Sequence, residues 1–258
     1  MQITNFSLPI FVAMFFQFFA DYLKHRLTAK SRHGTHSPFV YKLTDEVIYD
    51  FSAKKEYDEI EAQRKKLLHD VKNSSNKVLQ IAKSTLKPPH LAQLIYRLAA
   101  NQELNHIIEV NTGFGITTIY LSKAKPAADI LTIESNAEVA EIAHQNFIDL
   151  GLKNIELQVG NFNELLPKAI DEIEILDLLY VNGRQNKNTV LNYFNWSLRK
   201  VHDNSFLIVD DIYGDQDMKD AWTAIKNHPQ VTVTIDLFWL GLVYFRKGQA
   251  KEHFKIKF

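Results

Sequence analysis

The sequence predicts an α/β fold with a mostly parallel sheet, and three observations support this prediction. From residue 105 onward, short runs rich in β-branched residues alternate with helical patterns. One apolar run, at 106–111, passes through a turn of small residues directly into a helical pattern. Near the end of the chain, two β-rich runs follow each other closely, which is typical of an antiparallel hairpin.

The first part of the chain is expected to be helical, because it contains no long alternating run. Apolar residues recur at helical spacing over 57–71, and Asn73-Ser-Ser-Asn76 interrupts that pattern. Pro88-Pro89 then starts a further helix that runs to Leu98. We therefore expect a helical N-terminal extension at 1–88, serving as a lid or a dimerisation element, before an α/β domain at 89–258.

Within the α/β domain, each element follows from its own apolar pattern. The expected parallel strands are 106–111, 128–134, 154–160, 175–182 and 205–211. The expected helices are 116–123, 136–150, 163–172, 187–201 and 216–227. The terminal hairpin pairs 231–238 with 242–246 around a short turn at Gly241, which gives a seven-stranded sheet.

Composition restricts the setting and the partners. The chain has 258 residues, 46% of them hydrophobic, which is enough for a substantial core. Basic and acidic residues balance at 30 each, so we expect no nucleic-acid partner. The absence of cysteine excludes disulfides, thiolate metal sites and a thiol nucleophile, and it suits a cytoplasmic protein.

An apolar segment at 8–20 is shorter than the roughly 20 residues needed to cross a bilayer. We expect a helix that packs on the main domain or on a second subunit, and hence a homodimer. Basic residues follow the segment (Lys24, His25, Arg26 and Lys30), so contact with a membrane surface stays open as an alternative.

The run from His106 to Tyr120 is the strongest functional signal in the chain. A strand, a turn containing Gly113 and Gly115, and a helix are followed by a second strand that ends in Glu134. Open α/β sheets bind nucleosides with this arrangement. The glycines let the backbone approach the ligand, and the carboxylate accepts hydrogen bonds from ribose hydroxyls.

Residues 109–115 resemble the E-x-G-x-G-x-G motif of the class I S-adenosylmethionine-dependent methyltransferases, and the similarity extends over about 90–250. The runs 176–183 and 209–212 are similar to those of the small-molecule O-methyltransferase branch. The segments 32–39 and 251–254 resemble a Bacteroidetes-type subgroup of that superfamily. The resemblance implies a Rossmann-like methyltransferase fold in which the terminal hairpin closes the parallel sheet.

The resemblance also implies S-adenosylmethionine as the cofactor and methylation of a small molecule, with oxygen as the expected acceptor atom. Asn111 stands where the motif has its first glycine, but asparagine tolerates the left-handed backbone. Phe162 would lie against the adenine ring. The implied cofactor-binding residues are Glu109, Asn111, Gly113, Gly115, Glu134, Asn161 and Phe162.

At the acceptor side, the metal-dependent branch holds a divalent cation with residues at the ends of the fourth and fifth strands. The corresponding residues here are Asp210, Asp211 and Asn182, and Asp210 is the first candidate for handling the acceptor. The family-like Asp-Gly-x-His is replaced by Asn182-Gly-Arg-Gln185, which removes a carboxylate and an imidazole. A magnesium site is therefore doubtful.

His36 is the second candidate for a catalytic residue, on the expectation that its segment folds over the cleft as a lid. The alternative is a plain turn that side-chain hydrogen bonds hold in place.

Two other functions stay open at this point. Asn111, Asn182 and Gln185 fall at positions where the resemblance predicts working residues. A catalytically inactive protein that keeps the fold as a binding or structural module would show such replacements. A nicotinamide-dependent enzyme is the remaining alternative, but the chain has neither G-x-G-x-x-G nor a second βαβ half.

Overall fold

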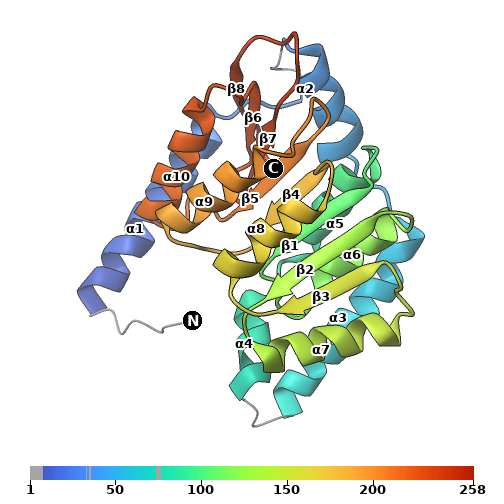
Figure 1. Ribbon diagram of the computed structural model, residues 1–258. Coiled ribbons are helices and arrows are strands. Elements are labelled where there is room, and N and C mark those ends of the chain that lie inside the picture. The colour runs from blue at the N-terminus through green and yellow to red at the C-terminus, as the bar shows by residue number, and fades with distance from the viewer. Residues whose placement is uncertain (1–7, 33, 35, 74–76) are drawn as a thin grey trace.

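The computed structural model describes residues 8–32, 34, 36–73 and 77–258. Within these residues one eight-stranded sheet forms, in the order β3-β2-β1-β4-β5-β7-β6-β8 (Figure 1). The strands are β1 (His106–Val110), β2 (Asp129–Glu134), β3 (Ile155–Val159), β4 (Leu178–Val181), β5 (Phe206–Asp210), β6 (Val233–Asp236), β7 (Leu240–Tyr244) and β8 (Glu252–Lys255). The first five strands are mutually parallel, whereas β7 runs antiparallel to both β5 and β6.

Helices cover both faces of the sheet. The helices are α1 (Leu8–Thr28), α2 (Pro38–Leu43), the π-helical turn η1 (Thr44–Ile48), α3 (Lys55–Asn73), α4 (Lys77–Thr85), α5 (Pro89–Ala100), α6 (Ile116–Ala124), α7 (Ala137–Asp149), α8 (Phe162–Glu172), α9 (Lys187–Ser197) and α10 (Gln216–Asn227). Helices α8, α9 and α10 lie together on one face, and α5 and α6 pack on the other (Figure 1).

Alternation along the strands builds these two layers, since successive side chains point to opposite faces of a sheet. Ile107, Leu178 and Ile208 belong to the core under α5, whereas the next residue of each strand belongs to the core under α8–α10. Strands buried on both faces are typical of parallel sheets between helical layers. The expected α/β class and its antiparallel end are confirmed.

Two details of the sequence prediction are wrong. The described sheet has one strand more than the seven expected, because β8 pairs with β6 although its short run is mostly polar. The hairpin turn lies at 237–239, where Phe238 has a φ of 71°, and not at Gly241. Gly241 lies within β7, where a Cβ atom would come within 2.6 Å of the Trp222 ring.

The N-terminal segment packs against the sheet from two sides. Val40 and Val47 lie in the same core as β1, β4 and β5, and Arg97 of α5 donates a hydrogen bond to the Val47 carbonyl oxygen at 2.8 Å. On the other side, α1 is held beside α10 and β6 (Figure 1). Among the described helices, none combines the length and apolar character needed to cross a bilayer. The boundary at residue 88 stays a prediction.

Candidate active site

The predicted site lies between β1 and β4, where the order in which strands are added to the sheet reverses. From β1 the chain passes through α6 to β2, and from β4 it passes through α9 to β5 on the other side. The turns that follow these two neighbouring strands therefore separate above the carboxyl edge of the sheet. Open α/β sheets bind their ligands at this kind of switch point.

The turn after β1 has the left-handed backbone that its sequence predicts. Asn111, Gly113 and Gly115 have φ angles of 72°, 57° and 79°, so the asparagine adopts the conformation that the usual glycine would have. A Cβ atom at Gly115 would come within 2.5 Å of the Phe147 ring, whereas one at Gly113 would meet no atom within 4 Å. The absence of a side chain at Gly115 thus makes room for the Phe147 ring, and Gly113 has open space beside its backbone.

Glu134 ties this turn to the end of β2. Its Oε2 accepts a hydrogen bond from the Gly113 amide at 2.9 Å, and its Oε1 accepts one from the Asn136 amide at 3.0 Å. The side chain is buried, yet each carboxylate oxygen has a further lone pair for a hydroxyl donor. The carboxylate is fixed beside Gly113, as a ribose ligand would need to be.

Glu109 lies beneath the turn. Its side chain is fully buried, and the hydroxyls of Thr118 and Thr132 donate hydrogen bonds to Oε2. Burial raises the pKa of Glu109 to about 7, although the two threonine hydrogen bonds oppose the shift. Glu109 therefore supports the turn from within the core.

The third part of the predicted cofactor site follows β3. The Gly160 amide donates to the Glu134 carbonyl oxygen at 2.9 Å, which places Asn161 and Phe162 beside the end of β2. Asn161 is exposed and caps α8, since its side chain accepts a hydrogen bond from the Asn163 amide. Phe162 is half-buried and packs against the core under α8–α10. The predicted cofactor residues thus gather at the carboxyl ends of β1, β2 and β3.

The turns after β1 and β4 are joined by a reciprocal pair of amides. Asn111 Nδ2 donates to the Asn182 carbonyl oxygen at 3.1 Å, and Asn182 Nδ2 donates to the Asn111 carbonyl oxygen at 3.0 Å. The Tyr180 hydroxyl donates to Asn182 Oδ1 at 2.8 Å. Asn111 and Asn182, which both differ from the residues of the resembling motif, therefore bond to each other's backbone.

Asp210, at the end of β5, meets a residue that the sequence did not indicate. Lys87 Nζ lies 2.6 Å from Asp210 Oδ2, and the Gly183 amide donates to the same oxygen at 2.9 Å. The side chains of Lys87 and Asp210 are only 10% and 11% exposed. Lys87 lies more than a hundred positions earlier in the chain, directly before Pro88-Pro89, and nothing in its local sequence reveals this pairing.

Asp211 is paired with a second cation. Arg184 Nε donates to Asp211 Oδ2 at 2.9 Å. Burial raises the pKa of Asp211, while the nearby Arg184 acts in the opposite direction. Asp211 has a left-handed backbone, with a φ of 55°, which turns the chain away from β5.

These contacts do not suit a resident divalent cation. Each of the three predicted ligands is engaged: Asp210 by Lys87, Asp211 by Arg184, and the Asn182 amide by Tyr180 and Asn111. Within the part of the chain that the structure describes, no group of three His, Asp or Glu side chains is arranged to hold a metal ion. The donor set therefore lacks the free negative charge that such an ion requires.

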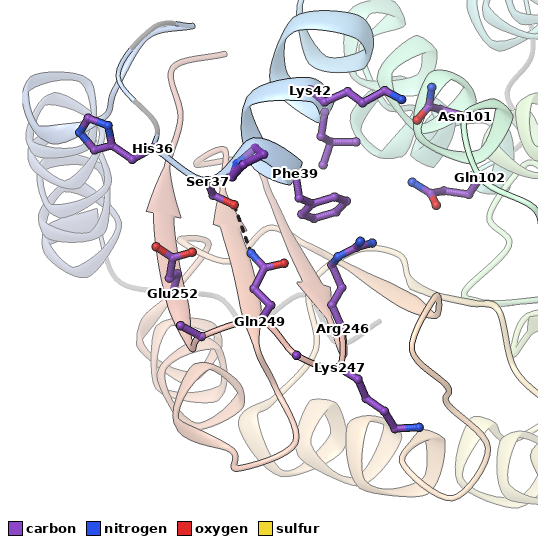
Figure 2. Close-up of a pocket in the computed structure, with 14 residues that line it drawn as sticks. His36, Ser37, Phe39, Lys42, Asn101, Gln102, Arg246, Lys247, Gln249 and Glu252 are labelled. Carbon is purple, nitrogen blue, oxygen red and sulfur yellow. Dashed lines mark hydrogen bonds between the residues drawn. The ribbon is translucent and has the colours of Figure 1, made fainter.

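His36 lies elsewhere. It is exposed beside an open cavity of about 890 Å³, whose lining includes Phe39, Arg246, Gln249 and Glu252 (Figure 2). Arg246 follows β7 and Glu252 begins β8, so this cavity opens at the amino edge of the parallel strands. The structure thus does not bring His36 to Asp210, and it gives no support to a lid over the carboxyl edge. The neighbouring His33 lies outside the described residues.

Comparison with known proteins agrees with the fold and the turn. A family model described as "Methyltransferase domain" matches residues 108–212. An O-methyltransferase of Aspergillus flavus is 30% identical over 120 residues, which are 42% of this chain and 46% of that protein. A protein-L-isoaspartate O-methyltransferase of Petrotoga mobilis is 35% identical over 77 residues, covering 30% of this chain and 35% of its own length. The chain thus spans less than half the length of these relatives.

Solved structures share the architecture at low sequence identity. A Podospora anserina methyltransferase bound to S-adenosylhomocysteine superimposes with a TM-score of 0.63 at 12% identity, covering 83% of this chain and all (100%) of its own. The O-methyltransferase TomG of Streptomyces achromogenes, in complex with S-adenosylmethionine, gives 0.57 at 18% identity, covering 80% and 95% of the two chains. The strand order, the turn at 111–115 and these solved structures together show a Rossmann-like methyltransferase fold, and residues 108–212 match the methyltransferase-domain family.

Proposed function

We propose that this protein is an S-adenosylmethionine-dependent methyltransferase that acts on a small molecule, with oxygen as the acceptor atom. The observation that carries the proposal is the link between the Gly113 amide and Glu134 Oε2 at the switch point of the sheet. That link holds an open backbone turn and an acidic strand end in the positions where this fold takes a nucleoside.

In this proposal, the chain's own residues bind and orient the cofactor. Gly113 lets the ligand approach the backbone, Glu134 accepts hydrogen bonds from the ribose hydroxyls, and Phe162 lies beside the adenine. Glu109 and Asn111 support the turn from below and from the side of β4. Bound S-adenosylmethionine would supply an activated methyl group, so the protein mainly has to align the acceptor with it. Asp210 and its neighbours mark the acceptor side.

The proposal is tested by incubating the purified protein with methyl-labelled S-adenosylmethionine and a panel of small phenols, enols and carboxylic acids. We expect label in at least one acceptor, and we expect Gly113→Ala to abolish the transfer. A protein that binds the cofactor but labels none of the panel would remove the assignment to these acceptors. Failure to bind the cofactor at all would favour the catalytically inactive alternative.

We further propose that the protein is a cytoplasmic homodimer and that α1 forms the contact. The outer side of α1 exposes five large apolar side chains (Phe15, Phe16, Phe19, Leu23 and Leu27). Covering such a surface with a second copy would remove it from water. In analytical ultracentrifugation the wild type should sediment as a dimer. The variants Phe16→Ser and Phe19→Ser should sediment as monomers. A monomer that floats with lipid vesicles would instead indicate membrane-surface contact. Membership of the Bacteroidetes-type subgroup stays a prediction.

A further inference from the structure

The ion pair between Lys87 and Asp210 joins the N-terminal segment to the acceptor side of the predicted site. Lys87 lies between α4 and α5, and the proline that follows it restricts its backbone to extended conformations. Its ammonium lies at the end of β5, within hydrogen-bond distance of Asp210 and 6.0 Å from the centre of the Tyr180 ring. Both members of the pair are nearly buried.

Burial makes this pair difficult to separate. Removing one partner would leave the other charge in a poorly solvated position, which costs far more than losing a surface ion pair. The Gly183 amide also donates to the oxygen that Lys87 binds, so Asp210 is held by the turn after β4 as well as by the segment before α5. The positive charge at the end of β5 is therefore a fixed part of the structure.

Each of the two aspartates at the end of β5 already has a cation beside it, and Arg184 Nε also lies 3.8 Å from Asp215 Oδ2. Lys87 neutralises Asp210, Arg184 neutralises Asp211, and Asn182 contributes an uncharged amide whose oxygen is used by Tyr180. A divalent cation bound to Asp210 would lie next to the Lys87 ammonium, and two positive charges so close together repel strongly. The cation would therefore have to displace Lys87. Hard cations are bound mainly by carboxylate oxygens with free charge, and these are lacking here.

We propose that the Lys87 ammonium takes the place of a divalent cation at the acceptor side, so that this site works without a metal ion. The inference rests on the proposed methyltransferase function. An ammonium has three N–H groups, of which one goes to Asp210, and another can donate to the acceptor oxygen. The acceptors that fit are oxygens that are anions at neutral pH. The oxygen lone pair forms the new bond to the methyl carbon, the carbon–sulfur bond breaks with its electron pair staying on sulfur, and no proton has to move.

The test measures Mn²⁺ binding by electron paramagnetic resonance in five proteins: the wild type, Lys87→Ala, Lys87→Arg, Asp210→Asn and Lys87→Ala/Asp210→Asn. The wild type and Lys87→Arg should bind no Mn²⁺ at millimolar concentration, because a cation already occupies the position. Lys87→Ala should bind Mn²⁺ at least tenfold more tightly than the wild type does. The double variant should bind it as weakly as the wild type. Lys87→Arg controls for charge, since it keeps the cation on a different side chain.

Two results would overturn the inference. One is a wild type that binds Mn²⁺ tightly and loses it in Asp210→Asn. The other is a Lys87→Ala protein, folded by circular dichroism, that stays as unresponsive to Mn²⁺ as the wild type. Should Lys87→Ala fail to fold, the wild type and Asp210→Asn titrations decide alone. Calorimetric binding of S-adenosylhomocysteine to the wild type tests the proposed function separately, because that ligand needs Glu134 and does not depend on Mn²⁺.

Discussion

Gly113 and Gly115, in the turn after β1, both have a positive φ angle but have different surroundings. Substitutions at the two positions therefore distinguish an effect on folding from an effect on cofactor binding. Gly115→Ala would place a methyl group against Phe147 and in a left-handed backbone, so it should lower the free energy of unfolding by about 2–5 kcal/mol. Gly113→Ala meets no neighbouring atom and should cost only about 1–2 kcal/mol. Denaturant unfolding measures both. In the binding assay, Gly113→Ala should lose the cofactor although it remains folded. Equal stability losses in the two variants would contradict this account of the turn.

Glu109 makes a prediction about pH. Its pKa is raised from 4.5 in the unfolded chain to about 7 by burial, so the native protein keeps a proton that the unfolded chain releases. The stability that this proton contributes is complete below pH 4.5 and is lost as the pH rises through about 7. The total is about 3 kcal/mol.

Calorimetric melting across this pH range checks the prediction. Glu109→Gln keeps the hydrogen bonds from Thr118 and Thr132 and cannot ionise, so its melting temperature should fall less than that of the wild type as the pH rises. Parallel curves for the two proteins would mean that Glu109 is already ionised in the folded state.

At the residue scale, the sequence predicted local conformations better than long-range contacts. The left-handed backbone of Asn111 was expected, because asparagine adopts it more readily than other residues with a Cβ atom. The role of Lys87 could not be expected, since its partner is brought close only by the completed sheet. His36 illustrates the converse. Its chemistry suggested a site, but the fold places it at the opposite edge of the sheet.

Among the elements, α1 depends on a small buried network at the end of β6. His25 Nε2 lies 3.1 Å from Asp236 Oδ1, and the Tyr213 hydroxyl donates to Asp236 Oδ2 at 2.7 Å. Burial alone would raise the pKa of Asp236, but the hydrogen bonds from His25 and Tyr213 bring it below its usual value. The helix is therefore tied to the sheet by a charged acceptor.

His25→Ala should release the end of α1 and lower stability by about 1–3 kcal/mol. Limited trypsin digestion should then cut faster at Lys24 and Arg26, whereas the exposed His144→Ala on α7 should behave as the wild type. Unchanged digestion of His25→Ala would show that the aromatic contacts of Tyr22 and Phe18 with Phe238 hold the helix without the network.

Strands β1, β4 and β5 are buried along most of their length and gave nearly continuous apolar runs, and this is why they were predicted from the sequence. In contrast, β8 is short and half-buried, and its polar residues give no comparable signal. The hairpin turn was misplaced for a related reason. Gly241 suggested a turn, but its missing side chain makes room for Trp222, and Phe238 adopts the positive φ instead.

For the whole molecule, the N-terminal segment shares one core with the α/β domain. Val40, Leu43 and Ile48 lie with Leu94 and Ile107 in that core, so a chain starting at residue 89 would expose their apolar contacts to water. We expect such a fragment to lose cooperative thermal unfolding as followed by circular dichroism. A fragment that melts like the full chain would instead identify residues 89–258 as an independent domain.

The central claim is that Glu134 and the turn after β1 form a site for S-adenosylmethionine, and calorimetric titration tests it most directly. The wild type and the matched control Glu138→Ala, an exposed acid at the start of α7, should bind S-adenosylmethionine and S-adenosylhomocysteine at micromolar concentration. Glu134→Ala should bind at least tenfold more weakly while remaining folded. Absence of binding to the wild type at millimolar ligand, or equal binding by all three proteins, would contradict the account.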